Sequence, residues 1–273
     1  MIKSLLLFGA VGFWAVAAVP TANAQDHRVP LRSFDRFELD PENADGLWVE
    51  AGATTLHGVS VSGGASGTAD FVTTGLRLAY GGKYGEIGGF LPYRFLSYDA
   101  GIFSGDEDGI GDLQLYGRWT PLHNDWVDAG LGLELQLPTG DENRGLGTGK
   151  VGLLPFASAG LHLGPADLRA HFGYNTYVGA DQVYGETIPP DSYLYGGGLW
   201  IPFAGVVAAR AELLAESFDL RPTIHTLAFE PGIDVMFPLD SLDLILRPTA
   251  GIGITSDSPD WSFGGSIALA WHG

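Results

Sequence analysis

The amino-acid sequence predicts an all-β protein: a transmembrane antiparallel up-and-down β-barrel of about twelve strands, preceded by a cleavable signal peptide. This prediction rests on an export signal, on a composition rich in glycine but poor in charge, and on apolar residues that alternate with polar ones. The chain contains 41 glycines and 12% aromatic residues, whereas charged residues make up only 17%. In an exported chain, this composition favours β-structure in a membrane over an acidic soluble domain.

Residues 1–24 have the three parts of a secretory signal peptide. Lys3 supplies the basic start, an uncharged apolar run extends from Leu5 to Val19, and residues 22–24 (Ala-Asn-Ala) form the small-residue cleavage site. The run is short for a membrane anchor and lies directly before a cleavage site. We therefore expect the mature chain to begin near Gln25.

Residues 25–45 precede the first expected strand and are charged, with apolar interruptions at Phe34, Phe37 and Leu39. Two arrangements are compatible with this pattern. The segment is either a disordered periplasmic N-terminal tail or a short plug that enters the mouth of the barrel. The barrel itself is expected to occupy residues 46–273.

The charge balance and the cysteine count limit the class of protein. The formal net charge is −18, and a protein of that sign does not attract nucleic acid. Cysteine is absent, so no disulfide framework is available to the exported chain. Stability must therefore come from burial and from backbone pairing.

The strands are recognised by a period of two. In residues 241–254, Leu242, Leu244 and Leu246 share one face, and Asp243 and Arg247 share the other. An apolar face that meets lipid, opposite a charged inner face, is the pattern of a transmembrane barrel. The same analysis predicts strands at 46–56, 69–80, 84–98, 109–119, 125–138, 150–163, 166–178, 191–202, 205–216, 225–237, 241–255 and 260–272.

One segment imitates a membrane helix, because residues 192–209 carry no charge. Three consecutive glycines at 196–198 and a central Pro202 favour two strands joined by a tight turn instead.

The connections between these strands alternate between long and short. Residues 57–68, 99–108, 139–149, 179–190 and 217–224 are expected to form long loops, whereas the other links, such as 81–83, are short. Bacterial barrels have short periplasmic turns and longer outer loops, so both chain ends are expected in the periplasm. Residues 139–149 then form an extracellular loop.

This loop contains the string GLGTGK at residues 145–150, which resembles a phosphate-binding loop only superficially. A Walker A loop needs glycine where Arg144 stands and Ser or Thr where Val151 stands, and it opens a helix. We therefore reject a phosphate site here.

Aromatic residues near the expected strand ends are predicted to lie at the two membrane interfaces, where amphipathic rings are favoured. They are Trp48, Trp119, Trp126, Tyr177, Tyr193, Trp200, Trp261 and Trp271.

Two neighbouring stretches carry a family resemblance. GIGDLQLYGRWTPL (109–122) and LGLELQLPTGDENRGLGTGK (131–150) are similar to outer-membrane barrels named for the meta-pathway of phenol degradation. This family is grouped with transporters of hydrocarbons and fatty acids. The resemblance covers mainly residues 109–163 and implies that small hydrophobic or aromatic compounds cross the outer membrane through this barrel. It supplies no catalytic motif that maps onto this chain.

The parity of the strands assigns a set of charged residues to the lumen. We take ten of them as candidates for a polar constriction, with ion pairs that merely fill a narrow barrel as the alternative. The candidates are Arg77, Arg94, Arg118, Glu134, Arg169, Arg210, Glu212, Glu230, Asp243 and Arg247. A lumen lined in this way is expected to offer a hydrophobic solute no apolar surface.

Enzymatic activity, a metal site and a cofactor are not expected. No histidine pair has zinc-ligand spacing, and no cysteine is present. Ser158 shares an inward face with His162, and His171 lies on the next strand, but no G-x-S-x-G motif surrounds the serine.

The sequence therefore predicts a porin-like transporter or channel of the Gram-negative outer membrane, with passive passage of small hydrophobic or aromatic compounds. The alternatives are a general small-solute or ion-conducting porin, and a structural or partner-binding barrel without transport. The expected partners are outer-membrane lipid, a small-molecule solute and the barrel-assembly machinery, but not nucleic acid.

Overall fold

The structure is a computed structural model that describes residues 44–62, 66–100, 103–179, 181–183, 186–188, 191–203, 206–218 and 224–271. The expected signal peptide and nearly all of the segment 25–45 lie outside the described residues. Within them, the only helix is the short 3-10 turn η2 (Glu142–Arg144), and no helix is long and apolar enough to cross a membrane.

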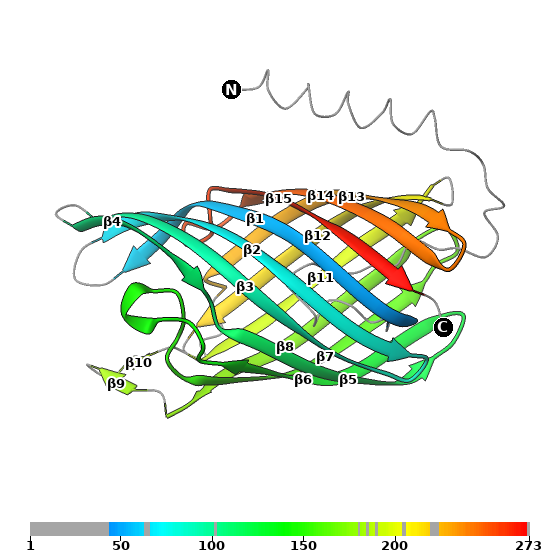
Figure 1. The fold of residues 1–273 in the computed structure, drawn as a ribbon, viewed down its shortest axis with the longest axis horizontal. Coiled ribbons are helices and arrows are strands. Elements are labelled where there is room, and N and C mark those ends of the chain that lie inside the picture. Colours follow the sequence, from blue (N-terminus) through cyan, green and yellow to red (C-terminus); the bar gives the residue numbers. More distant parts are fainter. Residues whose placement is uncertain are drawn as a thin grey trace, which may run out of the picture.

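Fifteen strands account for the rest of the regular structure (Figure 1). Their bounds are β1 (Gly46–Ser62), β2 (Ser66–Gly82), β3 (Gly85–Ala100), β4 (Phe103–Ile110), β5 (Leu113–His123), β6 (Val127–Leu137), β7 (Val151–His162), β8 (Asp167–Val178), β9 (Asp181–Val183), β10 (Glu186–Ile188), β11 (Ser192–Pro202), β12 (Val207–Phe218), β13 (Thr226–Leu239), β14 (Leu242–Gly253) and β15 (Trp261–Trp271).

Thirteen of these strands form one closed antiparallel sheet. Its order is β2-β1-β15-β14-β13-β12-β11-β8-β7-β6-β5-β3-β4, and an additional pairing of β2 with β3 closes the ring. The strands β4 and β5 pair with successive parts of β3, so they form one interrupted pass, and the barrel has twelve passes. The expected all-β fold and the number of strands are confirmed. Closure joins the first and last strands of the barrel, as a bilayer requires, and among the described strands β4, at the loop end, pairs with β3 alone.

The two ends of the barrel differ. At one end, which we call the turn end, the strands are joined at residues 83–84, 124–126, 163–166, 203–206 and 240–241. Ala44 and Trp271, where the described chain begins and finishes, lie at this end as well. We call the opposite end the loop end. It carries residues 138–150, which join β6 to β7 as the sequence predicted, and the separate hairpin of β9 and β10.

Two of the predicted long loops are wrong. Residues 57–68 and 99–108 belong mostly to strands, because β1 and β2 pair out to Ser62 and Ser66, and β3 and β4 pair out to Ala100 and Phe103. These hairpins continue the barrel wall at the loop end, and β4 projects from it in Figure 1. The uncharged segment 192–209 forms parts of β11 and β12, as expected.

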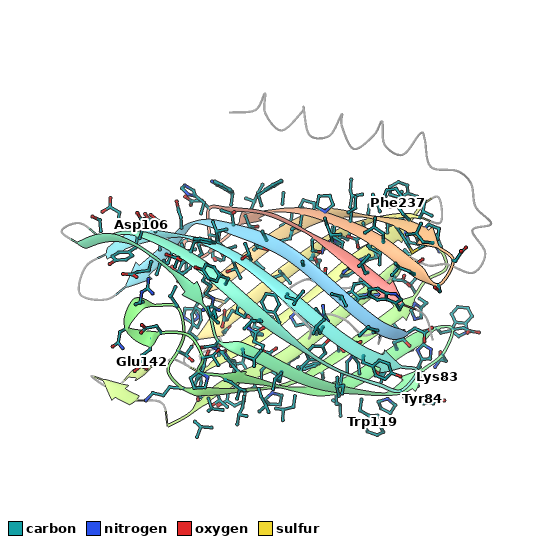
Figure 2. The ribbon with its side chains drawn as sticks, viewed as in Figure 1. Lys83, Tyr84, Asp106, Trp119, Glu142 and Phe237 are labelled. Atoms are coloured by element: carbon teal, nitrogen blue, oxygen red, sulfur yellow. The ribbon has the colours of Figure 1, made fainter. Side chains whose placement is uncertain are left out.

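The alternation of faces is confirmed. In β14, the inward residues Asp243, Ile245 and Arg247 are buried, whereas Leu244 between them faces outward and is partly exposed. Large apolar side chains cover the outside of the barrel, as the sticks in Figure 2 show, and Ile87 is 67% exposed. This surface matches the lipid-facing band of membrane barrels.

The predicted aromatic belt needs a correction. Trp119, Trp126 and Trp261 are exposed on the outside, in agreement with the prediction. Trp48 and Trp200, however, are only 2% and 1% exposed and point into the lumen. Trp48 has the same parity as Glu50, so its ring shares the inward face with that carboxylate.

Candidate functional site

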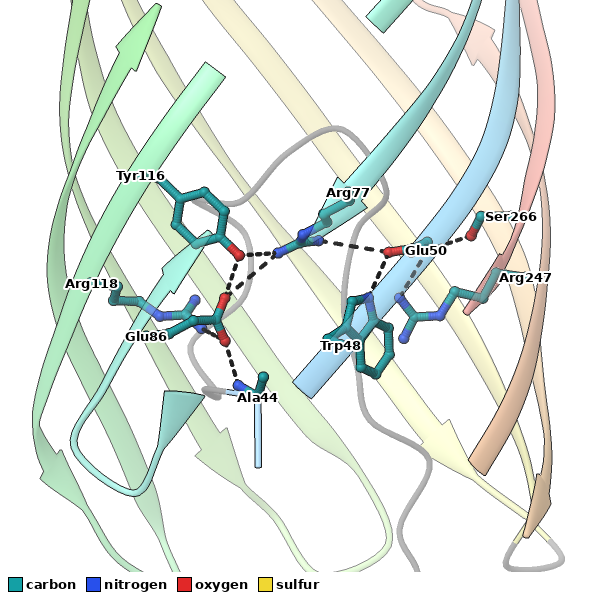
Figure 3. A network of polar contacts seen from close by, with 9 residues as sticks. All are labelled: Ala44, Trp48, Glu50, Arg77, Glu86, Tyr116, Arg118, Arg247 and Ser266. Atoms are coloured by element: carbon teal, nitrogen blue, oxygen red, sulfur yellow. Dashed lines mark hydrogen bonds and ion pairs between the residues drawn. The ribbon is translucent and has the colours of Figure 1, made fainter. Parts of the chain in front are cut away.

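The candidate site is a polar network inside the barrel near the turn end (Figure 3). At its centre, Arg77 of β2 lies between Glu50 of β1 and Glu86 of β3. The Arg77 Nη1 atom is 3.9 Å from Glu50 Oε2, and Nη2 is 3.8 Å from Glu86 Oε1. None of the three side chains has solvent-exposed surface in these pairs.

Further donors surround the Glu86 carboxylate. The hydroxyl of Tyr116 and the backbone N–H of Ala44 both donate to it, and the Arg118 Nη2 atom lies 3.5 Å away. The Arg77 guanidinium also donates to the Tyr116 hydroxyl at 3.1 Å. The hydrogen bond from Ala44 ties the residue before β1 to β3, a strand that does not pair with β1.

The Glu50 carboxylate is held in the same way. It accepts hydrogen bonds from the Trp48 indole N–H at 3.1 Å and from the Ser266 hydroxyl, and Arg247 Nη1 lies 3.7 Å away. Two buried carboxylates and three buried guanidinium groups therefore share one network. We call Trp48, Glu50, Arg77, Glu86, Tyr116, Arg118 and Arg247 the septum.

Aromatic rings cover the arginines of the lumen. The Arg77 guanidinium lies 5.5 Å from the centre of the Tyr116 ring, and Arg247 lies 5.1 Å from the Trp48 ring. On the other side of the barrel, Arg169 of β8 lies 4.6 Å from the Trp200 ring of β11. Such contacts attract a cation electrostatically and leave the other face of the ring apolar.

A second charged cluster lies on β12 and β13. The Arg210 Nη1 atom donates to Glu212 at 3.0 Å, and its Nε atom is 3.4 Å from Asp234 Oδ1. All three residues are buried. Burial of charge is costly unless it is paired, which explains why acids and arginines alternate around the lumen.

The lumen also has an apolar component, contrary to the expectation that charge alone would line it. Phe90, Met236 and Ile245 have inward parity and belong with Trp48 and Trp200 to one cluster of buried hydrophobic residues. At the turn end the inner wall therefore combines rings and aliphatic groups with paired charges.

Histidine and acidic residues form a chain at the rim of the turn end. The two ring nitrogens of His162 lie 2.6 Å from Asp167 and 2.8 Å from Asp128, and His123 contacts the same Asp128. Each carboxylate thus has a histidine partner. Among the described residues, no group of three or more His, Cys, Asp or Glu side chains is placed to hold a metal ion.

Ser158 and His171 are register partners on β7 and β8, and both side chains are buried. The Ser158 hydroxyl nevertheless makes no hydrogen bond in the described part of the chain. Nucleophilic catalysis needs a base within hydrogen-bond distance of the serine, and this pair does not provide it.

At the loop end, Asp112 organises the connection between β6 and β7. Asp112 lies in the gap between β4 and β5 and is fully buried. Its carboxylate accepts hydrogen bonds from the Gly140 N–H at 3.0 Å, the Thr148 N–H at 2.7 Å, the Thr148 hydroxyl at 2.9 Å and the Gln136 amide at 2.7 Å. We call these contacts the latch.

Other contacts reinforce the latch. The Thr139 hydroxyl donates to the Gly111 carbonyl at 2.8 Å, and Arg94 donates to the carbonyl of Leu146, whose side chain is 1% exposed. Arg144 and Glu107 form an ion pair at 2.6 Å, and this hydrogen bond raises the pKa of the Arg144 guanidinium above its ordinary value. The residues that carry the family resemblance, from Gly111-Asp112 to Thr148, therefore fix one loop against the wall.

Comparisons with known proteins support the fold. No family model matches this sequence, and no curated protein matches it either. The structure is similar to an outer-membrane channel from Pseudomonas putida F1, with a TM-score of 0.61 and 16% identity over 88% of this chain and 99% of that chain. It is also similar to the KdgM porin, with a TM-score of 0.50 and 7% identity over 82% and 99% of the two chains.

A third similar structure is the translocator domain of the autotransporter NalP from Neisseria meningitidis, with a TM-score of 0.51 and 14% identity over 85% of this chain and 90% of that one. The fold is that of an outer-membrane barrel. At these identities, the likeness concerns the fold and leaves the solute open.

The structure places all ten candidate residues on the inner side. Arg77, Arg118 and Arg247 meet in the septum, Arg210 and Glu212 in the second cluster, and Arg169 against Trp200. The rest are distributed along the wall, with Glu134 and Asp243 buried and with Arg94 and Glu230 partly buried.

The ring partners Trp48, Tyr116 and Trp200 were not among the candidates. The parity that identified Arg118 would have located Tyr116 two residues away, and the same period places Trp48 and Trp200 on the inward face.

Proposed function

We propose that this chain is a passive channel of the bacterial outer membrane that carries small hydrophobic or aromatic compounds. A closed barrel with an apolar exterior and a lumen that contains paired charges supports a membrane location. The likeness to an outer-membrane channel over nearly the full length of both chains supports a role in transport.

The observation that carries the choice of solute is the pairing of arginines with aromatic rings in the lumen. Trp48, Tyr116 and Trp200 each lie beside a guanidinium group, and Phe90 adds a further ring. Such a wall offers an aromatic solute stacking surface and offers its polar substituent a hydrogen-bond donor. It suits a small aromatic compound better than a wall of charge alone would.

A solute that enters at the loop end passes the latch first and meets the septum afterwards. A solute that passes between the buried septum residues has to displace their side chains. An aromatic ring that enters between Arg77 and Tyr116 replaces the contact it breaks, whereas a hydrated ion must keep its water or lose it at high cost.

An uptake assay tests this proposal. A porin-depleted Gram-negative host that expresses the barrel should take up radiolabelled phenol faster than the same host without it. The purified barrel in planar bilayers should show no large steady conductance. A large steady conductance without faster phenol uptake would favour the ion-conducting porin, which the charged residues of the lumen support. If the barrel showed neither faster phenol uptake nor conductance, the result would favour a barrel without transport.

A further inference from the structure

The outside of the barrel wall is hollowed at the turn end, between β2, β3, β5 and β6. The hollow has a volume of about 880 Å³, which lies within the range of small-molecule sites, roughly 300–1,000 Å³. Glu86 and Arg118 of the septum also line it, but their side chains point into the lumen, whereas the hollow lies on the outer side of the wall. Nothing in the proposed transport reaction uses it.

Backbone without side chains forms the floor of the hollow. Gly82, Gly85 and Gly117 line it and have outward parity, since they lie two residues from the exposed side chains of Tyr80, Ile87 and Trp119 respectively. Gly82 pairs with Gly85, and Gly117 pairs with Ile87. A Cβ atom built on Gly117 would meet nothing closer than Ile87 at 4.0 Å, so the space above it is open.

Large apolar side chains form the two walls. Tyr80 and Ile87 stand on one side, and Trp119, Leu131 and Leu133 stand on the other. All five are exposed on the outside of the barrel. A chain of methylene groups is a ligand whose polarity suits an open apolar hollow of this kind.

A cation stands where the hollow reaches the turn. Lys83 and Tyr84 form the turn between Gly82 and Gly85, and the Lys83 ammonium lies 5.1 Å from the Tyr84 ring. Figure 2 shows these two residues and Trp119 together at one end of the barrel. Among the described residues of the turn-end connections, Lys83 carries the only positive charge, in a protein whose net charge is −18.

We propose that the hollow binds one phospholipid of the periplasmic leaflet, with an acyl chain on the glycine floor and the phosphate beside Lys83. The ammonium group of lysine is a compact charge that binds phosphate well. The site rests on the proposed membrane location, which places the turn end in the periplasm. It does not depend on which solute crosses the lumen.

Native mass spectrometry tests this site with the full barrel in a mild detergent and added phosphatidylglycerol. The wild type should retain one phospholipid. Gly117→Leu fills the floor with four carbon atoms and should lower the lipid-bound fraction at least about tenfold. Lys83→Gln should lower the lipid-bound fraction by a smaller factor, because this change removes the charge but leaves the apolar hollow open.

Two variants serve as matched controls. Ala211→Leu adds three carbon atoms at an outward position of β12, and Asp240→Asn removes a charge at another turn. Both should bind phosphatidylglycerol like the wild type. Equal binding by all five proteins would overturn the proposal, because it would show unspecific contact with lipid. A dimer that Gly117→Leu abolishes would overturn it too, because a second copy would then fill the hollow.

Phenol uptake measured on the same variants separates this site from the proposed function. Gly117→Leu should leave phenol uptake unchanged while it lowers the lipid-bound fraction. A barrel that fails to take up phenol but still retains the phospholipid would contradict the transport proposal alone.

Discussion

The Asp112 carboxylate accepts the backbone N–H of Thr148 at 2.7 Å, across 36 residues of sequence. This contact joins the interrupted strand pass to the loop between β6 and β7. Because a charged acceptor with four donors is buried here, its removal should lower the free energy of opening the loop by ~2–3 kcal/mol. Asp112→Ala in lipid vesicles should therefore be cleaved by trypsin after Arg144 at least about tenfold faster.

Asp240→Asn, which removes a carboxylate at the other end, is the control for that experiment and should be cleaved at the wild-type rate. Unchanged cleavage of Asp112→Ala would mean that the loop is held by Arg94 and Thr139 without the carboxylate.

The septum predicts strong coupling between Arg77 and Glu86. Arg77→Met leaves the carboxylates of Glu50 and Glu86 with fewer partners in a buried place, which should cost ~3–5 kcal/mol of unfolding free energy. Glu86→Gln in the same protein removes one of those charges and should restore part of the loss. Urea titration of the barrel folded into lipid vesicles measures Arg77→Met, Glu86→Gln alone and the double variant. Strictly additive losses would show that the two side chains do not interact.

The faces of β14 give a second stability test. Leu244 faces lipid, so Leu244→Arg should lower the unfolding free energy by ~2–4 kcal/mol. Thr249 faces the lumen, next to Gly232 and Gly264 of the adjacent strands, so an arginine at this position does not enter lipid. Thr249→Arg should therefore cost less in the same urea titration. The reverse order would mean that this strand presents its other face to lipid.

The orientation of the barrel can be tested with epitope tags. An insertion after Asn143, in the exposed turn η2, should be accessible to antibody on intact cells. An insertion after Gly82 should become accessible only once the outer membrane is permeabilised. The structure favours Asn143 over other positions in 140–148, because Gly140, Leu146 and Thr148 are engaged in the latch. If the tag after Gly82 were accessible on intact cells and the tag after Asn143 were not, the barrel would have the reverse orientation.

Much of the fold follows from the period of two. Alternation in stretches such as 242–253 determines both the strand and its faces, because a shift by one residue would exchange the side chains that face lipid with those that face the lumen. The charged residues of the lumen were located for the same reason.

Other features depend on contacts between distant segments, which periodicity does not contain. The end of β1 up to Ser62 and the start of β2 from Ser66 have the composition of a loop and are held by pairing between the two strands. The latch needs Asp112 and Thr148 to meet. Trp48 and Trp200 were placed by their distance from the strand ends, although parity was the better guide to which side of the wall they occupy.

The strand pair that joins the two ends of the chain is as extensive as its neighbour. β1 and β15 share a continuous register from Leu47↔Trp271 to His57↔Trp261, and β14 pairs with β15 over an equally long register from Leu242 to Ile252. The ring therefore has no weak seam where its first and last strands meet. If the ends were linked and the chain were cut at another hairpin, the same barrel should form, because the pairing of neighbouring strands does not depend on which strand comes first in the chain.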